Sequence, residues 1–375
     1  MDVVQLTQSL IAFDTVSPPG NEEDCARYIA DFLKDLHAEG ASVELHKFAP
    51  RRANVIATFR GDSPGLLLGG HIDVVPPGDL AGWTSPPFEG KVRNGKLFGR
   101  GAVDMKGGVA AMMAAVEAAR RRKLKRSLTF VATAGEEVGF DGLRAAMKAG
   151  KLEGVSAVCG LVGEPTDMRV VRGHRGGLTI EVKVHGKSAH SSDPSVGVNA
   201  VEKTVEFIEK LQPLRRELAK VVDPDLGQTL VTPTVIEGGT KSNVIPASCT
   251  LTLDIRTVPG ITRRTVLEGL NAIVQSIHKK DRDFKADLQV LYDTLPLAVP
   301  ATDKVVKLAE EITGTPSTIV LYGTEAPEYC KLGVPTVVLG PGSIKEAHTY
   351  DEFVPLEQLK LAESVYGKFV DIVCK

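Results

Sequence analysis

Acidic residues and histidines stand directly after several apolar segments of this 375-residue chain. The segment "SLTFVATAGEEVG" contains the adjacent carboxylates Glu136 and Glu137, and "GLLLGGHIDVV" carries His71 and Asp73. Glu164 follows "VSAVCGLVG" in the motif "GEPT". These apolar segments have the length of buried strands. Ligands of open α/β sheets bind beyond the carboxyl ends of the strands, so we expect these side chains to meet at one edge of a sheet.

Two more residues extend this pattern. Asp104 lies in the glycine-rich segment "GRGAVDMKGG", and His348 follows the apolar segment "PTVVLG". Each feature alone has a simple explanation: an Asp before a helix can be an N-cap, and the pair His71 and Asp73 can be purely structural. A phosphate-binding loop is disfavoured, because neither GxGxxG nor GxxxxGK[ST] is present and a carboxylate repels phosphate. Recurrence at four strand ends favours one shared site.

The donors are carboxylates and imidazoles without thiolates. So many carboxylates in one crevice would repel each other without cations. The donor set favours Zn²⁺, Mn²⁺ or Co²⁺ in a catalytic site over a structural zinc. Two histidines and at least three carboxylates suit two metals about 3.5 Å apart with one bridging carboxylate. A further unligated carboxylate would serve as general base, while the absence of a GxSxG elbow disfavours covalent catalysis.

Glu136 and Glu137 have different expected directions. Adjacent residues of an extended segment point to opposite sides. The two carboxylates therefore face different surroundings, and the sequence predicts two different roles for them.

Apolar strands alternate with helical segments up to about residue 176. The strand segments are "ASVELHKF", "NVIATF", "GLLLGGHIDVV", "SLTFVATA" and "VSAVCGLVG". This alternation predicts an α/β fold with a mixed, largely parallel sheet that helices cover on both faces. The same alternation of helices and apolar strands returns near the end of the chain, in the helix "DKVVKLAEEIT", the strand "PTVVLG" and the final helix. We therefore predict a discontinuous catalytic domain made of residues 1–176 and 291–375.

The middle of the chain has a different pattern. The segment "LTIEVKVHG" alternates strictly between apolar and polar residues, which is typical of a half-exposed strand. A helix with Val201, Val205, Ile208 and Leu211 on one stripe follows it, and then two strands, a helix and a strand. The order β-α-β-β-α-β predicts a ferredoxin-like α+β domain, residues 177–290, inserted into the first domain.

Composition excludes several classes of protein. Hydrophobic residues make up 43% and charged residues 25%, which is ordinary for a soluble enzyme. The net charge of −2 shows no basic excess for nucleic acid, and the basic run at 120–126 suits the end of a helix. Five scattered cysteines without CxxC spacing predict reduced thiols and a cytoplasmic protein. The first residues predict an amphipathic helix rather than a signal peptide, and no apolar run reaches the ~18 residues of a membrane span.

The motifs "HIDVVP", "GRGAVDMKGG", "AGEEVG", "GEPT" and a late "AH" occur together in one order. In this respect the chain resembles, over nearly its whole length, the cocatalytic-zinc metallopeptidase family of acetylornithine deacetylase, succinyl-diaminopimelate desuccinylase, aminoacylase and carboxypeptidase G. The resemblance implies two divalent metals, Zn²⁺ by preference. It implies one metal on His71 and Glu164, the other on Glu137 and His348, and Asp104 between them.

The resemblance also implies roles around the metals. Asp73 would orient His71, Glu136 would be the general base, and the peptide bond Asp104–Met105 would be cis. The inserted domain would be a lid that forms a homodimer, and His190 would reach the active site of the partner subunit to stabilise the oxyanion. Asn243 and Arg256 would contact substrate. Loop, turn and solvated-strand positions, respectively, are the alternatives for His190, Asn243 and Arg256.

The substrate is also implied by resemblance. "YGTEAPEY" and "GPGSIKEAHTYDEF" are more similar to acetylornithine deacetylase than to the desuccinylase, which has Ser-Asp where this chain has Glu325-Ala326. We therefore expect hydrolysis of N2-acetyl-L-ornithine, with succinylated diamino acids, other N-acyl amino acids and dipeptides as alternatives. Glu325 would pair with the substrate's ammonium group and Arg256 with its carboxylate, although a surface role for Glu325 is the alternative. A binding protein without catalysis would lack some of these residues, and all are present.

Overall fold

The computed structural model describes residues 1–36, 41–119, 124–155 and 157–375. These residues form two compact units. The first comprises Met1–Arg172, Val299–Ile319 and Thr324–Lys375, and the second Gly173–Ala298 and Val320–Gly323. The second unit is thus wider than the range 177–290 expected for the inserted domain. Most of the basic run at 120–126 lies outside the described residues.

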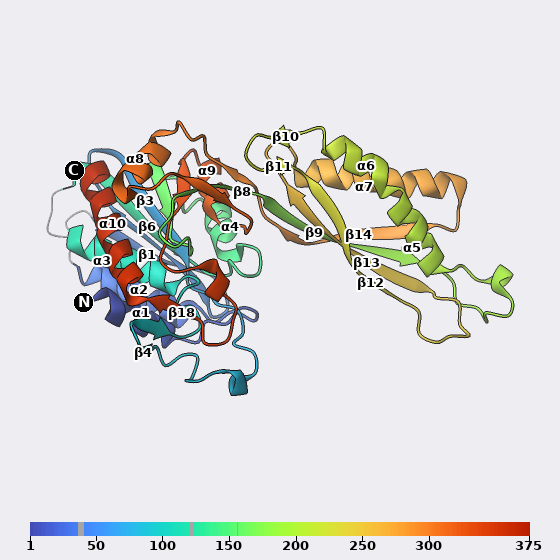
Figure 1. Ribbon diagram of the computed structural model, residues 1–375, viewed down its shortest axis with the longest axis horizontal. Helices are drawn as coiled ribbons and strands as arrows, with labels where there is room; N and C mark the ends of the chain where they lie inside the picture. Colours follow the sequence, from blue (N-terminus) through green and yellow to red (C-terminus); the bar gives the residue numbers. More distant parts are fainter. Residues whose placement is uncertain (37–40, 120–123, 156) are drawn as a thin grey trace. The chain divides into compact units, whose positions relative to one another are not determined.

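A nine-stranded sheet forms the centre of the first unit, although its terminal strand β15 is assigned to the second unit (Figure 1). Its four middle strands run parallel: β6 (Arg126–Thr133), β3 (Ser63–His71), β7 (Ala157–Val162) and β17 (Thr336–Val338). The antiparallel strands β1 (Ala41–Ala49) and β2 (Arg52–Phe59) extend it beyond β6. Beyond β17 come β8 (Val171–His174), β15 (Leu297–Ala298) and β16 (Thr318–Val320). The middle strands are almost continuously buried, as expected of parallel strands covered on both faces.

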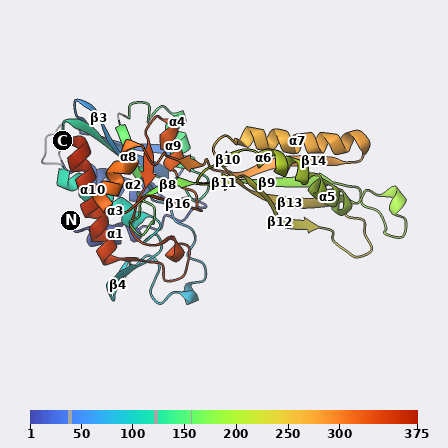
Figure 2. The same cartoon turned by 45° about the horizontal axis from the view of Figure 1, so that its top comes forward.

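Helices cover this sheet. The helices α1 (Val3–Ile11), α3 (Lys106–Ala119) and α10 (Leu356–Cys374) pack together and lie side by side in both views (Figures 1 and 2). The helices α2 (Glu23–Lys34) and α4 (Asp141–Lys148) pack against β1 and β2. The helices α8 (Lys304–Thr313) and α9 (Ala326–Lys331) contact β17. The predicted mixed α/β sheet is confirmed.

The glycines of "GRGAVDMKGG" serve close packing. A Cβ atom at Gly108 would lie 2.1 Å from the carbonyl oxygen of Gly163, so α3 approaches the end of β7 at a distance that only glycine permits. Gly163 directly precedes Glu164, and Gly108 lies one turn after Asp104. The glycine pair therefore sets the spacing between two of the predicted metal ligands.

The second unit is an antiparallel sheet with helices. Its strands are β9 (Gly176–His185), β12 (Leu230–Gly238), β13 (Ser248–Thr257) and β14 (Lys285–Asp293), in the spatial order β12-β13-β9-β14. The short strands β10 (Val222–Asp223) and β11 (Gly227–Gln228) pair separately. The helices α5 (Ala200–Glu209) and α6 (Leu211–Leu218) follow β9, and α7 (Arg263–Lys280) follows β13. This is the predicted β-α-β-β-α-β order of a ferredoxin-like fold.

The first helix of this unit differs from the prediction. It is divided into α5 and α6, and its buried side chains are Ala200, Thr204, Phe207 and Leu211. The predicted stripe began at Val201, yet Val205 is 47% exposed. Both stripes have helical spacing, and the large ring of Phe207 buries more apolar area than a valine, which decides the face.

A third sheet joins distant segments of the first unit. Its strands are β4 (Lys91–Arg93), β5 (Lys96–Phe98) and β18 (Phe353–Pro355), in the order β18-β5-β4. It connects the chain just before Asp104 with the chain just after His348. All five cysteines are free thiols. Among the described residues, no helix has the length and apolar character that crossing a membrane requires.

Candidate metal centre

The predicted ligands of the first unit come from one edge of the sheet. These ligands follow three parallel strands. Strand β3 ends at His71, β6 ends three residues before Glu136, and β7 ends two residues before Glu164. Asp104 precedes α3, and His348 lies between the 3₁₀ turn Ile344–Glu346 and β18. Parallel neighbours place their carboxyl ends together, which is why residues far apart in sequence converge here.

Asp104 stands between the two histidines. Its Oδ1 lies 3.1 Å from Nε2 of His71, and its Oδ2 lies 3.2 Å from Nε2 of His348. Glu164 Oε1 is 3.4 Å from the same nitrogen of His71, and Glu137 Oε1 is 3.1 Å from that of His348. The five side chains thus form two sets that share the two oxygens of one carboxylate.

Charge in this cluster is balanced by the imidazoles. Burial and the charge of Asp104 raise the pKa of Glu164 to about 8, and the same two causes raise the pKa of Glu137. Contacts with Asp104 and Glu137 raise the pKa of His348 to about 10. Burial alone would lower the pKa of His71, but the charge of Glu164 and contacts with Asp104 raise it well above its usual range. The carboxylates require positive charge, and the donor set fits divalent metal ions, which would displace these protons.

Asp73 holds both the histidine and the glutamate pair. Its Oδ1 lies 3.5 Å from Nδ1 of His71, and that nitrogen is 3.0 Å from the Asp73 carbonyl oxygen. The two carboxylate oxygens accept hydrogen bonds from the backbone N–H groups of Glu136 (3.0 Å) and Glu137 (3.1 Å). A histidine that binds metal needs such an acceptor to fix its ring. Here the same carboxylate also fixes the turn that carries two further site residues.

Glu136 and Glu137 have different surroundings. The Glu137 carboxylate contacts His348, whereas the Glu136 carboxylate makes no hydrogen bond or ion pair with any described part of the chain. Burial raises the pKa of Glu136 well above its usual range, with His71 opposing and Glu164 adding to the shift. Glu136 is therefore a buried carboxylate with high proton affinity beside the ligand cluster.

Glu325 lies beneath this edge of the sheet. Its side chain is fully buried and accepts hydrogen bonds from Thr133 Oγ1 (2.7 Å) and the Tyr329 hydroxyl (3.1 Å). Burial raises the pKa of Glu325 to about 7. The surface alternative for Glu325 is therefore wrong. Its contact with a substrate ammonium group stays a prediction.

The three site residues predicted in the second unit do not lie together. The backbone N–H of Ser191 donates to the carbonyl of Asn243 (3.1 Å), and His190 pairs with Val244, so His190 and Asn243 lie on adjacent segments. Ser248 pairs with His185 at one end of the sheet. His190 follows His185 in the chain and Asn243 precedes Ser248, so both residues lie beyond this end. Arg256 lies near the other end of β13, where it contacts Asp254 (3.0 Å). At about 3.3 Å per strand residue, Arg256 is about 26 Å from the Ser248 end.

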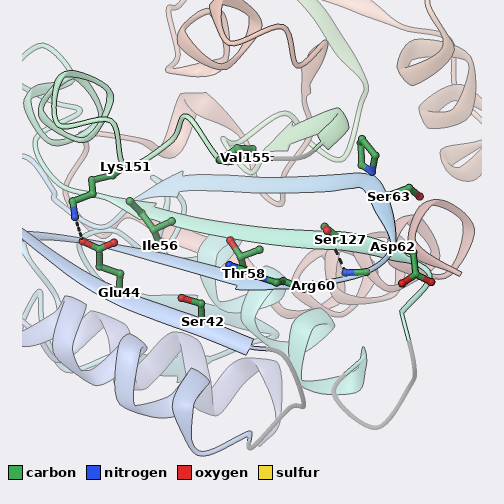
Figure 3. A pocket seen from close by; sticks show the side chains of 13 residues that line it. Ser42, Glu44, Ile56, Thr58, Arg60, Asp62, Ser63, Ser127, Lys151 and Val155 are labelled. Carbon is green, nitrogen blue, oxygen red and sulfur yellow. Dashed lines mark hydrogen bonds and ion pairs between the residues drawn. The ribbon is translucent and has the colours of Figure 1, made fainter.

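A separate cavity lies at the opposite edge of the central sheet (Figure 3). It has a volume of about 430 Å³ and is bordered by the end of β2 and the start of β3 and β6. Ile56 and Thr58 of β2 point toward it, and the ion pair between Lys151 and Glu44 closes one end. None of the predicted site residues lines it.

Comparisons with known proteins agree with this site. Residues 67–371 match the model of the peptidase family M20/M25/M40. The chain belongs to this family. It is 34% identical to acetylornithine deacetylase of Proteus mirabilis, over 98% of this chain and 94% of that protein. Family membership makes the chain a metal-dependent hydrolase. The resemblance that the motifs predicted is confirmed.

Solved structures of the M20 family share the fold. An M20 family metallo-carboxypeptidase from Sulfolobus solfataricus has a TM-score of 0.81 at 20% identity, covering 99% of both chains. A dinuclear metal binding peptidase from Bacillus subtilis has a TM-score of 0.70 at 18% identity, covering 99% of this chain and 97% of that one. At these identities the likeness concerns the fold.

Proposed function

We propose that this M20 family chain is a two-metal amidohydrolase that removes the acyl group from N-acyl-L-amino acids. The arrangement of Asp104 carries the proposal: its two oxygens face two histidines, each of which has its own glutamate. A single metal would leave one of these two sets without a cation. Zn²⁺ suits the mixed nitrogen and oxygen donors, as Co²⁺ and Mn²⁺ also do.

The residues around the metals would divide the work. Bound divalent metals would polarise the amide carbonyl and lower the pKa of a water molecule. Glu136, the carboxylate without a partner in the described chain, takes the proton from the attacking water and passes it to the leaving amine. In the metal-free chain burial raises the pKa of Glu136, which suits a carboxylate that holds a proton between these two steps. Asp73 contacts both His71 and the backbone N–H of Glu136, and so holds the two residues in fixed positions relative to each other.

N2-acetyl-L-ornithine is the substrate that we propose, with L-ornithine and acetate as products. The relative from Proteus mirabilis carries the name of this activity. N-succinyl-diaminopimelate, other N-acyl amino acids and dipeptides are the competing substrates of the same chemistry. A substrate panel on metal-reconstituted protein tests the proposal. We expect the highest kcat/KM for N2-acetyl-L-ornithine, and a higher value for the succinylated substrate would contradict the assignment.

A homodimer through the second unit is the second part of the proposal. Within the described part of the chain the edge strand β12 pairs on one side, with β13, and its residues Val235 and Ile236 are about half exposed. Val205 on α5 is similarly exposed. Apolar side chains on an open sheet edge invite pairing with another chain. A dimer would also explain why His190 and Arg256 lie at opposite ends of one sheet, since different subunits could bring them to one substrate.

Mixed dimers test this arrangement. A Glu136→Ala chain and a His190→Ala chain are each expected to be nearly inactive alone. If His190 acts on the partner subunit, the heterodimer contains one site with both residues intact. Refolding the two chains together at equal amounts should therefore restore about a quarter of the wild-type activity by random pairing. No recovery, with heterodimers demonstrated by tagged chains, would show that His190 acts within its own subunit or not at all.

A further inference from the structure

Glu352 makes an unusual set of contacts beside the metal centre. Its side chain is fully buried. One carboxylate oxygen, Oε1, accepts hydrogen bonds from the backbone N–H groups of Val103 (3.0 Å) and Asp104 (3.2 Å). The other, Oε2, accepts from Nη1 of Arg100 at 2.6 Å. Glu352 thus holds the backbone of the carboxylate that stands between the two histidines.

The position of Glu352 in the chain connects this contact with a second ligand. His348 lies four residues earlier, and β18 begins at the next residue. Strand β18 pairs with β5, with Phe353 opposite Phe98, and the Glu352 carbonyl accepts from the N–H of Gly99 (2.9 Å). The segments that carry Asp104 and His348 are therefore joined by a strand pair and by one buried carboxylate.

Arg100 brings a third segment into this contact. Its side chain is 3% exposed and also donates to the Pro76 carbonyl (3.4 Å), five residues after His71. The guanidinium lies over the ring of Trp83, 5.2 Å from its centroid. Two nitrogens of one rigid, planar guanidinium thus contact Glu352 and Pro76, which fixes the positions of these two partners relative to each other. The pair of Glu352 and Arg100 therefore ties together the chain around His71, Asp104 and His348.

We propose that Glu352 is a positioning residue that sets the separation of Asp104 and His348, and thereby the affinity for the metal held by Asp104, Glu137 and His348. This inference rests on the proposed two-metal function. Without the carboxylate, two successive buried N–H groups next to the shared ligand would lose their acceptor. The backbone of Asp104 would then be free to shift relative to His348, and a metal bound between them would lose one well-placed donor.

The test uses metal-free full-length protein and follows metal binding rather than turnover. Glu352→Gln keeps the size of the side chain, but its uncharged amide oxygen is a weaker acceptor for the two N–H groups, and the amide NH2 places a donor against Arg100. Glu328→Gln is the matched control, because Glu328 is also buried in the first unit and paired with Arg144 and Lys331. Zn²⁺ is titrated calorimetrically in competition with a chelator. Hydrogen exchange of the Val103 and Asp104 amides is measured in the same metal-free proteins.

We expect Glu352→Gln to weaken one of the two binding steps by about 10–100-fold, to leave the other within about threefold, and to speed exchange at both amides. Glu328→Gln should change neither measurement. Wild-type metal affinities and amide exchange rates in Glu352→Gln would overturn the proposal. Equal weakening of both binding steps in Glu352→Gln would also overturn it, as would the same weakening in Glu328→Gln. If Glu352→Gln does not fold, Arg100→Lys carries the test: it should weaken the same single step, and wild-type affinity would overturn the proposal.

This experiment separates the inference from the proposed function. A wild-type protein that binds two metals but hydrolyses no acyl amino acid would refute the function and leave the positioning role testable. A wild-type protein that binds a single metal would refute the two-metal function. A protein that hydrolyses the substrate but shows no effect of Glu352→Gln on metal binding would refute the inference alone.

Discussion

The functional side chains of the two units are held in opposite ways. In the first unit His71, Asp104 and Glu164 are buried, and each contacts at least one other member of the cluster. The side chain of His348 is 51% exposed, but Asp104 and Glu137 hold it from the inner side of the cluster. In the second unit His190 and Asn243 are exposed, and the hydrogen bonds to His190 come from its own loop. A metal centre must hold like charges at short range, so its residues need fixed neighbours. Exposed residues instead gain their partners when substrate or another subunit arrives.

The two glutamates test the largest contrast, which lies within the first unit. We expect Glu136→Ala to keep both metals and to lower kcat at least ~10³-fold, because the carboxylates of Asp104, Glu137 and Glu164 each contact a histidine and would be occupied as ligands. Glu137→Ala should lose metal, since its carboxylate contacts His348 directly. Metal content by elemental analysis, measured beside kcat, separates the two. An active Glu136→Ala enzyme would show that the roles are assigned wrongly.

His190 tests the exposed side of the comparison. Nδ1 of His190 accepts a hydrogen bond from the backbone N–H of Ser192 (3.1 Å), which leaves Nε2 to donate to an oxyanion. We expect His190→Ala to lower kcat by about 10²–10³-fold while the free energy of unfolding changes by less than about 0.5 kcal/mol. Urea unfolding and steady-state kinetics on the same preparation check both. A large loss of stability would mean that the residue is structural.

Glu325 tests the buried side through pH. Burial raises its pKa from its usual value to about 7 in the folded chain. The folded state therefore favours the protonated carboxyl, and this stabilisation is complete below about pH 4.5 and is lost as the pH rises through 7. We expect Glu325→Gln to remove this loss, on the order of 1–3 kcal/mol, between pH 5 and 8. Denaturant unfolding of the metal-free protein across that range provides the measurement. If the free energy of unfolding of Glu325→Gln varies with pH as that of the wild type does, the assignment is contradicted.

Arg256 should give the smallest effect. Its side chain is 43% exposed and forms an ion pair with Asp254, two residues earlier on β13. If it binds the substrate carboxylate, Arg256→Lys should raise KM by about tenfold, because an ammonium group cannot form two parallel hydrogen bonds. The value of kcat and the melting temperature should stay near wild type. Glu268→Gln, on the exposed face of α7, is the control for a general change of surface charge.

The sequence predicted the strands that form the metal-ligand edge because buried parallel strands are long, apolar and end in polar residues. It also predicted which side chains meet there, since carboxyl ends of neighbouring parallel strands coincide. It predicted the wrong stripe on α5, because two stripes have the same helical spacing and only the packing of Phe207 distinguishes them. It missed the pair of Glu352 and Arg100: both lie inside the motifs "GPGSIKEAHTYDEF" and "GRGAVDMKGG", but nothing in either motif shows that two residues 252 positions apart meet in the fold.

The sequence by itself determined the kind of chemistry. Carboxylates and imidazoles at several strand ends need cations, whatever the detailed geometry. The tertiary structure decided how the work is divided: Asp104 offers one oxygen to each histidine, Glu137 contacts His348, and the Glu136 carboxylate is left without a hydrogen bond in the described chain. These distinctions depend on distances of a few ångströms between residues up to about 250 positions apart. The packed strands, the glycine contact at Gly108 and the carboxylates of Asp73 and Glu352 fix distances of that size.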